Sequence, residues 1–283
     1  MSDTETTRKL QREFWNSEAT HRWVTEQARI DRLFAEVTNA ALTAAAPKPG
    51  ESVLDIGCGT GTTVLRLADA VGPGGTVLGV DISEQQLALA RRRIEAAGAA
   101  QAQVVVDDAA TRDFVPGGFD LAFSRFGVMF FADPVAAFSN IRRAMKSGGR
   151  LAFAVFRPGS DNPWTTASAA AIRHLVTPPA PPGPEEPGQF SWGDPNRVRR
   201  ILGGAGFRDV ALAPIDPLIT LGSSAAEAAE FAMFIGQGSR LLQGVSDATR
   251  QAARVALEAF FKTHEGPNGV SLPGGLWLVS ARN

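Results

Sequence analysis

Three glycines at alternate positions, Gly57, Gly59 and Gly61, follow an apolar run and open a helix-like segment. Glycine permits positive φ and close approach of the backbone to a ligand, and a helix N-terminus presents free N–H groups. Asp55 lies inside the preceding strand, and Asp81 closes the next strand twenty residues beyond Gly61. A carboxylate at the end of that second strand is placed to accept both hydroxyls of a ribose. The pattern therefore predicts a nucleoside-binding loop.

The spacing of these glycines differs from that of a dinucleotide site. Dinucleotide folds normally use G-x-G-x-x-G to hold a pyrophosphate, whereas this loop reads G-x-G-x-G with Asp55 beside it. A negative side chain would repel a pyrophosphate but can hold an ammonium group through ordered water. We therefore predict an aminoacyl nucleoside as the ligand. The alternatives are a tight turn without a ligand and, for Asp81, a helix cap, a role that suits Ser83 better.

The same residues carry a family resemblance. Val53–Gly61 reads VLDIGCGTG and resembles the first motif of the class I S-adenosylmethionine-dependent methyltransferases. Val80–Ser83 looks like the ribose-binding second motif, and Asp107–Ala109 is similar to the third motif, which meets the adenine. Ser124–Phe131 resembles the fourth motif, beneath the methionine part of the cofactor. The chain looks most like the small-molecule branch related to ubiquinone/menaquinone biosynthesis C-methyltransferases, although Ser147–Gly149 replaces the usual PGG turn.

The resemblance implies S-adenosylmethionine as the cofactor and a small molecule as the methyl acceptor. Transfer from a sulfonium is an in-line displacement, which requires nucleophile, methyl and sulfur to be collinear at near-attack distance. No metal is needed, and no clustered His/Cys spacing suggests one. The cofactor-binding residues expected from the loop and the resemblance are Asp55, Gly57, Cys58, Gly59, Gly61, Thr62, Asp81, Ile82, Gln86, Asp108, Ala109 and Ser124.

The acceptor side of the site has its own candidate residues. A positioned base would help if the acceptor is a hydroxyl, and in a chain without tyrosine His174 is the best candidate, although a surface or packing role is favoured for each of the three histidines. The side chains expected to line an apolar acceptor pocket, with core packing as the alternative, are Trp23, Phe126, Met129 and Trp164. Cys58 is expected to be a small residue tolerated in the loop, where alkylation would impair cofactor binding.

Composition limits the competing functions. The 283 residues carry 28 basic and 29 acidic side chains, so no basic field attracts nucleic acid or an anionic membrane. One cysteine cannot form an internal disulfide. We see no targeting segment, and the most apolar window, Phe119–Phe131, is too short to span a bilayer, so we expect a cytoplasmic protein without a membrane span. The sequence carries no signal for a particular oligomeric state.

Three alternative functions remain open. Nucleic-acid methylation is disfavoured because Ser124-Arg125-Phe126-Gly127 is not the Asn/Asp-Pro-Pro-aromatic motif that grips a flipped base. A nicotinamide-dependent oxidoreductase is disfavoured by the G-x-G-x-G spacing. A non-methylating member of the fold would bind the cofactor as a structural element or catalyse a cyclisation, and fold analogy cannot separate it from a true transferase.

The elements that must position these residues alternate along the chain. Apolar runs predict strands at Ser52–Ile56, Thr76–Val80, Gln103–Val106, Phe119–Ser124 and Arg150–Phe156. Between them lie helices, one begun by a capping box of Ser83 and Gln86 and another by Asp133 with Pro134. This alternation predicts an α/β fold. With the family resemblance it becomes a doubly wound, Rossmann-like, seven-stranded methyltransferase sheet with a helical cap and insert.

The flanking regions complete the predicted organisation. An amphipathic helix is expected within Thr20–Ala45, a loop or lid at the proline-rich Pro178–Pro187, and a last strand at Gly275–Ala281. The expected regions are an N-terminal helical cap (1–46), the cofactor-binding core (47–157), a helix with the proline-rich lid (158–193), a core helix and strand (194–222), a helical insert (223–266) and a final core strand (267–283).

Overall fold

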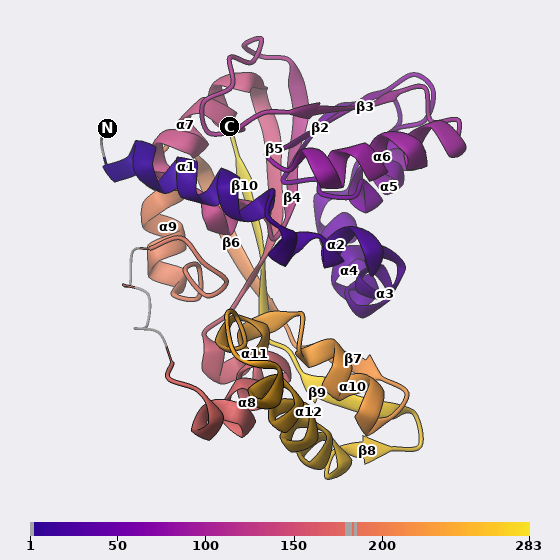
Figure 1. Cartoon of the computed structure of the whole chain (residues 1–283). Coiled ribbons are helices and arrows are strands. Elements are labelled where there is room, and N and C mark those ends of the chain that lie inside the picture. The colour runs from indigo at the N-terminus through magenta and orange to yellow at the C-terminus, as the bar shows by residue number, and fades with distance from the viewer. Residues whose placement is uncertain (1–2, 179–182, 184–185) are drawn as a thin grey trace. The chain divides into compact units, whose positions relative to one another are not determined.

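The computed structural model describes residues 3–178, 183 and 186–283. The chain forms two compact units (Figure 1). Unit 1 comprises Met1–Val155, Glu185–Pro214 and Trp277–Asn283, and unit 2 comprises Phe156–Pro184 and Ile215–Leu276. Most of the expected proline-rich lid, Pro178–Pro187, lies outside the described residues.

A seven-stranded sheet forms the centre of unit 1. Its strands are β1 (Ser52–Ile56), β2 (Thr76–Asp81), β3 (Ala102–Val106), β4 (Phe119–Arg125), β5 (Met145–Phe156), β6 (Arg208–Ile215) and β10 (Leu276–Arg282). They run in the order β3-β2-β1-β4-β5-β10-β6, and β1 pairs in parallel with both β2 and β4. The strand order reverses between β1 and β4, and ligands of open α/β sheets bind at the carboxyl ends of such strands. The predicted seven-stranded α/β fold is confirmed.

Helices cover both faces of this sheet. They are α1 (Asp3–Trp15), α2 (Arg22–Thr25), α3 (Gln27–Leu33), α4 (Ala35–Ala45), α5 (Thr62–Val71), α6 (Glu84–Ala96), α7 (Pro134–Ala144) and α9 (Pro195–Gly204), with 3₁₀ turns η1 (Glu18–Thr20) and η2 (Gly127–Phe130). Figure 1 shows α5 and α6 on one side of the sheet and α7 and α9 on the other. No described helix is long and apolar enough to cross a membrane.

The predicted helix within Thr20–Ala45 is interrupted. At Glu26 and Phe34 the backbone leaves the helical region, with ψ of 17° and 16°, so three shorter helices replace one long helix. Phe34 is buried and its ring meets that of Phe126 edge-on, with centroids 5.0 Å apart. Tertiary packing therefore overrides the continuous helical pattern. α1, with no buried residue, was not predicted.

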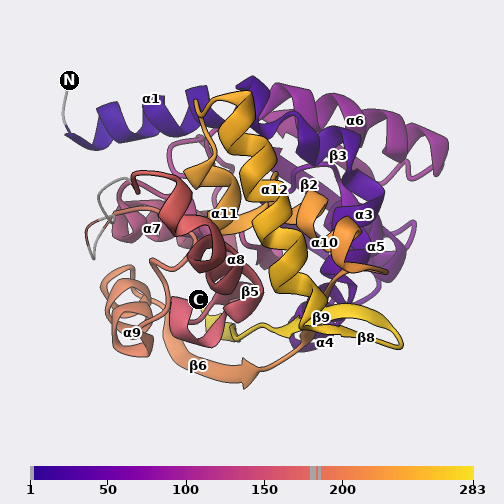
Figure 2. The same cartoon turned by 60° about the horizontal axis from the view of Figure 1, so that its bottom comes forward.

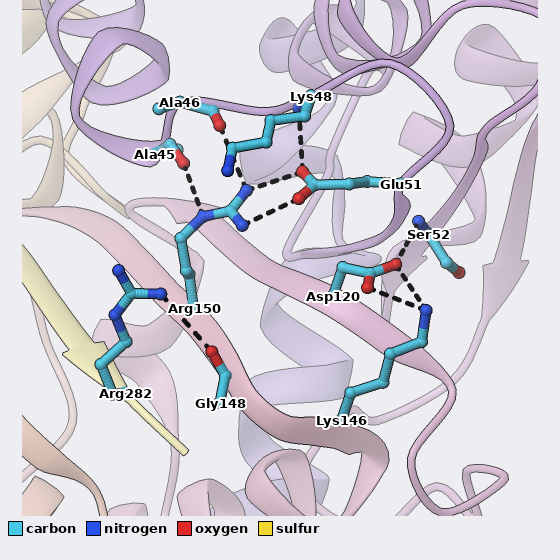
Figure 3. Close-up of polar contacts among 10 residues, drawn as sticks. All are labelled: Ala45, Ala46, Lys48, Glu51, Ser52, Asp120, Lys146, Gly148, Arg150 and Arg282. Atoms are coloured by element: carbon cyan, nitrogen blue, oxygen red, sulfur yellow. Dashed lines mark hydrogen bonds and ion pairs between the residues drawn. The ribbon is translucent and has the colours of Figure 1, made fainter.

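Polar contacts hold the amino ends of the parallel strands. Arg150 donates to both carboxylate oxygens of Glu51, at 2.8 and 2.6 Å, and to the carbonyls of Ala45 and Ala46 at the end of α4 (Figure 3). Asp120 accepts from the Ser52 backbone N–H at 2.9 Å. These contacts fix α4 and β1 at the end of the sheet opposite the glycine loop.

Unit 2 combines a small antiparallel sheet with helices. Its elements are η3 (Gly159–Asp161), α8 (Pro163–Ile172), η4 (Arg173–Leu175), β7 (Leu218–Gly222), α10 (Ala225–Ala232), α11 (Gly236–Leu241), α12 (Asp247–Lys262), β8 (Glu265–Gly266) and β9 (Gly269–Pro273). The strand order is β7-β9-β8. Figures 1 and 2 both show α12 beside α8 and α10. Buried aromatic side chains from three helices, Trp164, Phe231 and Phe261, contribute to its core.

Two expected boundaries differ from this arrangement. The region 267–283 was expected to be one core strand, but Gly269–Pro273 pairs with β7 in the small sheet and only Leu276–Arg282 joins the large one. Likewise, Leu218–Gly222 was assigned to the core and lies in unit 2. The two short strands β7 and β9 pair with each other across a long stretch of sequence. The residues near a strand do not indicate which sheet it will join, and this explains the difference.

Candidate functional site

The glycine loop follows β1 at the carboxyl edge of the sheet. Gly57, Gly59 and Gly61 have φ of 67°, 54° and 84°, a region that residues with a Cβ rarely adopt. A Cβ on Gly57 would lie 2.6 Å from Cα of Gly127, and one on Gly61 would lie 2.9 Å from Cβ of Ala90. The glycines are therefore required by both backbone conformation and space.

Asp81 lies at the end of β2 and contacts this loop directly. Its Oδ2 accepts from the Gly59 N–H and its Oδ1 from the Ser83 N–H, both at 2.8 Å. Burial raises the pKa of Asp81, and the backbone hydrogen bonds oppose that shift. The carboxylate predicted to hold a ribose is thus half-buried and fixed against the glycine loop.

The predicted capping box does not form. The Ser83 hydroxyl donates to the Trp15 carbonyl at 2.8 Å and makes no cap bond. The first turn of α6 is closed instead by Asn16, whose Oδ1 accepts from the Glu84 N–H at 3.0 Å. Gln86 is buried, and its Oε1 lies 2.9 Å from where a Gly59 Cβ would be. Gln86 thus lies beside the loop instead of capping a helix.

Asp55 is fully buried beneath the loop. Its Oδ2 accepts from the Thr63 hydroxyl at 2.5 Å, while its Oδ1 is buried without a partner among the described residues. Burial is the main cause that raises the pKa of Asp55 to about 7, with Thr63 and Arg125 opposing it. An unpaired buried oxygen is energetically costly, so a bound donor near it would be favoured.

The segment expected to meet the adenine forms a tight turn after β3. Asp108 Oδ1 accepts from the Ala110 N–H at 2.9 Å, and the Asp108 N–H donates to Asp107. Asp107 in turn pairs with Arg112 at 2.7 Å. Ala109 is buried. The turn is therefore held by its own side chains; its contact with adenine stays a prediction.

Ser124 connects the ends of β1 and β4. Its fully buried hydroxyl donates to the Ile56 carbonyl at 2.8 Å and accepts from the Gly127 N–H at 3.1 Å. Both contacts hold the loop edges, so Ser124 positions the neighbouring backbone. Cys58 is also buried, and that burial raises the pKa of its thiol well above the ordinary value. A thiol in this state is a poor nucleophile.

The sequence did not identify Asp31 and Arg93, which hold the start of α5. Thr62 donates to Asp31 at 2.6 Å, Arg93 donates to Thr62 at 2.9 Å, and Arg93 and Asp31 form an ion pair at 3.1 Å. The sequence pattern that could have identified Asp31 is a row of residues at helical spacing, i, i+4, i+7 and i+11. Their side chains contact one another, the start of α5 or the end of β4, and they are Gln27, Asp31, Phe34 and Thr38.

Aromatic side chains gather where the N-terminal segment meets η2. Trp15 contacts Trp23 and Phe130 edge-on, with centroids 5.8 and 5.2 Å apart. All three are half-buried. Phe126 is also half-buried and has a φ of 73°, whereas Met129 is buried. Four of these aromatic side chains therefore keep exposed surface near the end of β4.

The other two acceptor-side candidates, Trp164 and His174, belong to unit 2. Trp164 is buried, donates its indole N–H to Asn162 and packs on Phe156 with centroids 5.8 Å apart. It is therefore a core side chain of that unit. His174 is exposed on η4. Their contact with an acceptor stays a prediction. In the described part of the chain no three His, Cys, Asp or Glu side chains gather as metal ligands.

Comparison with known proteins agrees with this geometry. A family model described as a methyltransferase domain matches residues 53–149. The demethylmenaquinone methyltransferase of Beutenbergia cavernae is 32% identical over 192 residues, which cover 64% of this chain and 74% of that protein. The aklanonic acid methyltransferase DauC of Streptomyces sp. (strain C5) is 38% identical over 116 residues, covering 40% of this chain and 53% of its own.

The matches differ in how much of each relative they cover, and one solved structure shares the fold. The chain spans between 30% and 66% of the length of four of the curated relatives that it matches. The crystal structure of the YcgJ protein from Bacillus subtilis superposes with a TM-score of 0.59 at 15% identity, covering 88% of this chain and 98% of that one, and so shares the fold. With the loop, Asp81 and these relatives in agreement, the chain belongs to the class I S-adenosylmethionine-dependent methyltransferases.

Proposed function

We propose that this chain transfers a methyl group from S-adenosylmethionine to a small-molecule acceptor. The observation that carries the proposal is the contact between the glycine loop and Asp81, in which the Gly59 N–H binds the carboxylate at 2.8 Å. This contact fixes the Asp81 carboxylate, which we propose binds the ribose, beside a backbone that a Cβ would obstruct. An aminoacyl nucleoside suits both features and also the unpaired Oδ1 of Asp55.

Each residue of the site has a distinct part in binding. Asp81 would accept the ribose hydroxyls, and Asp108 with the Ala109 N–H would meet the adenine. Asp55 would face the ammonium group of the methionine. When bound, the cofactor supplies a methyl group on a sulfonium, and the contribution of the protein to its transfer is to hold the reacting atoms in line.

The acceptor is proposed to be an apolar small molecule. The half-buried Trp15, Trp23 and Phe130 provide aromatic surface in unit 1, and burial of such surface favours apolar or aromatic ligands. Two matched relatives are named for small-molecule acceptors, aklanonic acid and demethylmenaquinone. A positioned base would help if the acceptor is a hydroxyl, and His174 is our candidate for that case.

Calorimetric titration with S-adenosylhomocysteine tests the cofactor part of this proposal. The wild type is expected to bind, and Asp81→Ala to bind roughly 10- to 100-fold more weakly because hydrogen bonds to a charged group are lost. Asp113→Ala is the matched control, since that carboxylate is 99% exposed. Equal affinity of wild type and Asp81→Ala would remove Asp81 from the site.

Incubation with S-adenosylmethionine and candidate acceptors tests the transfer itself. Release of S-adenosylhomocysteine with a mass increase of one methyl group on an apolar acceptor is the expected result. Acceptor turnover without demethylated cofactor would identify a non-methylating member of the fold. A methylated oligonucleotide as the only product would overturn the small-molecule proposal.

A further inference from the structure

The outermost strand of the large sheet, β6 (Arg208–Ile215), has a free edge. It pairs with β10 on one side, and among the described residues no strand lies on its other side. Within residues 3–178, 183 and 186–283, no backbone hydrogen bond from outside the sheet reaches the N–H and carbonyl groups of β6. A row of unpaired backbone groups along a strand is a template for a further strand.

The same strand leaves an apolar run open to solvent. Val210–Ile215 reads VALAPI, six consecutive residues without a polar side chain. No residue of β6 is buried, whereas β4 buries four of its seven residues. Ala211 and Ala213 are exposed, and Leu212 is half-buried. Covering such a run removes apolar surface from water, so an open edge of this composition favours association with another chain.

Both ends of this run carry features that restrict strand pairing. Arg208 places a charge at the start of the strand, and Asp209 has a φ of 54°, which interrupts the extended backbone. Pro214, near the other end, has no backbone N–H to donate. The four residues Val210–Ala213 between them carry no such feature. They form a short window that can pair with one further strand.

We propose that two copies of this chain pair through Val210–Ala213 in antiparallel orientation and form a closed dimer. A two-fold axis between Ala211 and Leu212 places Val210 of each copy opposite Ala213 of the other, so the two windows coincide. The large sheet then continues from one copy into the other. Because each copy uses the same edge, the association closes at two chains.

The charges around β6 favour this orientation. Parallel pairing in register would place Arg208 against Arg208 and Asp209 against Asp209, and like charges directly opposite each other are destabilising. Antiparallel pairing instead brings Arg208 to the end of the neighbouring strand, which Asp216 follows. The Asp216 side chain pairs with Arg157 and is still 65% exposed. Opposite charges therefore meet at both ends of the paired window.

Sedimentation velocity of the full chain over a series of concentrations tests the dimer. The wild type should form a species of two chains that dissociates on dilution. The double variant Ala211→Lys, Ala213→Lys should dimerise roughly 10-fold more weakly or worse, because the lysines of the two copies face each other. Both alanines are exposed, so thermal melts of the dilute double variant should match those of the wild type.

Val255→Lys is the matched control, because Val255 is a 59% exposed apolar residue on α12, away from β6 in the sequence. It should dimerise as the wild type does. Hydrogen exchange then locates the contact: amides of β6 should exchange more slowly in the dimeric wild type and keep fast exchange in the double variant. A monomer at every concentration would overturn the proposal. So would a dimer that the two lysines leave intact, or open assemblies larger than two chains.

Discussion

Asn16 closes the first turn of α6 from 68 positions away in the chain. Its Oδ1 accepts from the Glu84 N–H at 3.0 Å, and its amide donates to the Ile82 carbonyl at 2.9 Å. Ile82 directly follows Asp81, so one exposed side chain of the N-terminal segment supports the turn that carries the proposed ribose contact.

Asn16→Ala should therefore weaken both stability and binding. Loss of a capping side chain costs about 0.5 to 2 kcal/mol, which denaturant unfolding would measure. Affinity for S-adenosylhomocysteine should fall severalfold because the turn after Asp81 loosens. Asn16→Asp keeps the acceptor for Glu84 and should retain most of the stability. Unchanged unfolding of Asn16→Ala would show that the cap contributes nothing.

Binding of the cofactor product should depend on pH through Asp55. Its pKa of about 7 means that the carboxylate needed to face an ammonium group is mostly protonated at pH 6 and ionised at pH 8. Affinity for S-adenosylhomocysteine should rise about tenfold over that interval. Asp55→Asn should bind weakly with a flat pH profile. A flat profile in the wild type would contradict the role of Asp55.

The same group should make the ligand-free protein less stable as pH rises. The folded pKa of Asp55 lies above that of an unfolded aspartate, so the folded state holds the proton more tightly. This contribution is complete below about pH 4 and is lost as the pH approaches 7. Thermal melts at a series of pH values should show a shallower decline for Asp55→Asn than for the wild type.

Gly127→Ala should destabilise the fold and weaken ligand binding. Its new Cβ would lie 2.5 Å from the Ile56 carbonyl oxygen and 2.7 Å from Cα of Gly57, both backbone atoms that cannot move freely. Overpacking of this kind costs about 1 to 3 kcal/mol. Gly74→Ala, with nothing within 4 Å of the new Cβ, is the control for unfolding measurements. Equal stability of the two variants would show that the contact at Gly127 relaxes without cost.

Acid should weaken the pairing of Glu51 with Arg150. The hydrogen bond from Arg150 lowers the pKa of Glu51, so its stabilisation is present above the unfolded pKa and is lost as pH falls through the folded one. Glu51→Gln should cost about 1 to 3 kcal/mol at pH 7 and reduce the acid sensitivity of the melt. Glu13→Gln, in an exposed pair with Lys9, should do neither.

The sequence predicted most of the large sheet because its strands are short apolar runs between helices. Ser52–Ile56 was predicted with the observed bounds. Asp133 was likewise identified as a cap, and its Oδ1 accepts from Ala136 at 3.0 Å. Both signals are local, since the residues that decide the structure lie within four positions of one another.

Contacts between distant segments could not be predicted in the same way. Ser83 is a residue type that often caps helices, yet its hydroxyl donates to the Trp15 carbonyl, and Asn16 caps the helix instead. No sequence pattern near Ser83 indicates that Asn16 will replace it. The small sheet of unit 2 was missed for a related reason, although Ile219 and Leu221 are buried at the alternate positions typical of a strand.

The hydrogen bond between Asp31 and Thr62 joins the N-terminal segment to the helix that follows the glycine loop. Thr62 begins the helix that follows the glycine loop, and Asp31 belongs to the N-terminal segment. Docking of that segment and occupation of the loop are then linked equilibria, each strengthening the other by the same free energy. Amide hydrogens of α3 and α4 should exchange more slowly once nucleoside is bound, so the N-terminal helices act as a reporter of ligand occupancy.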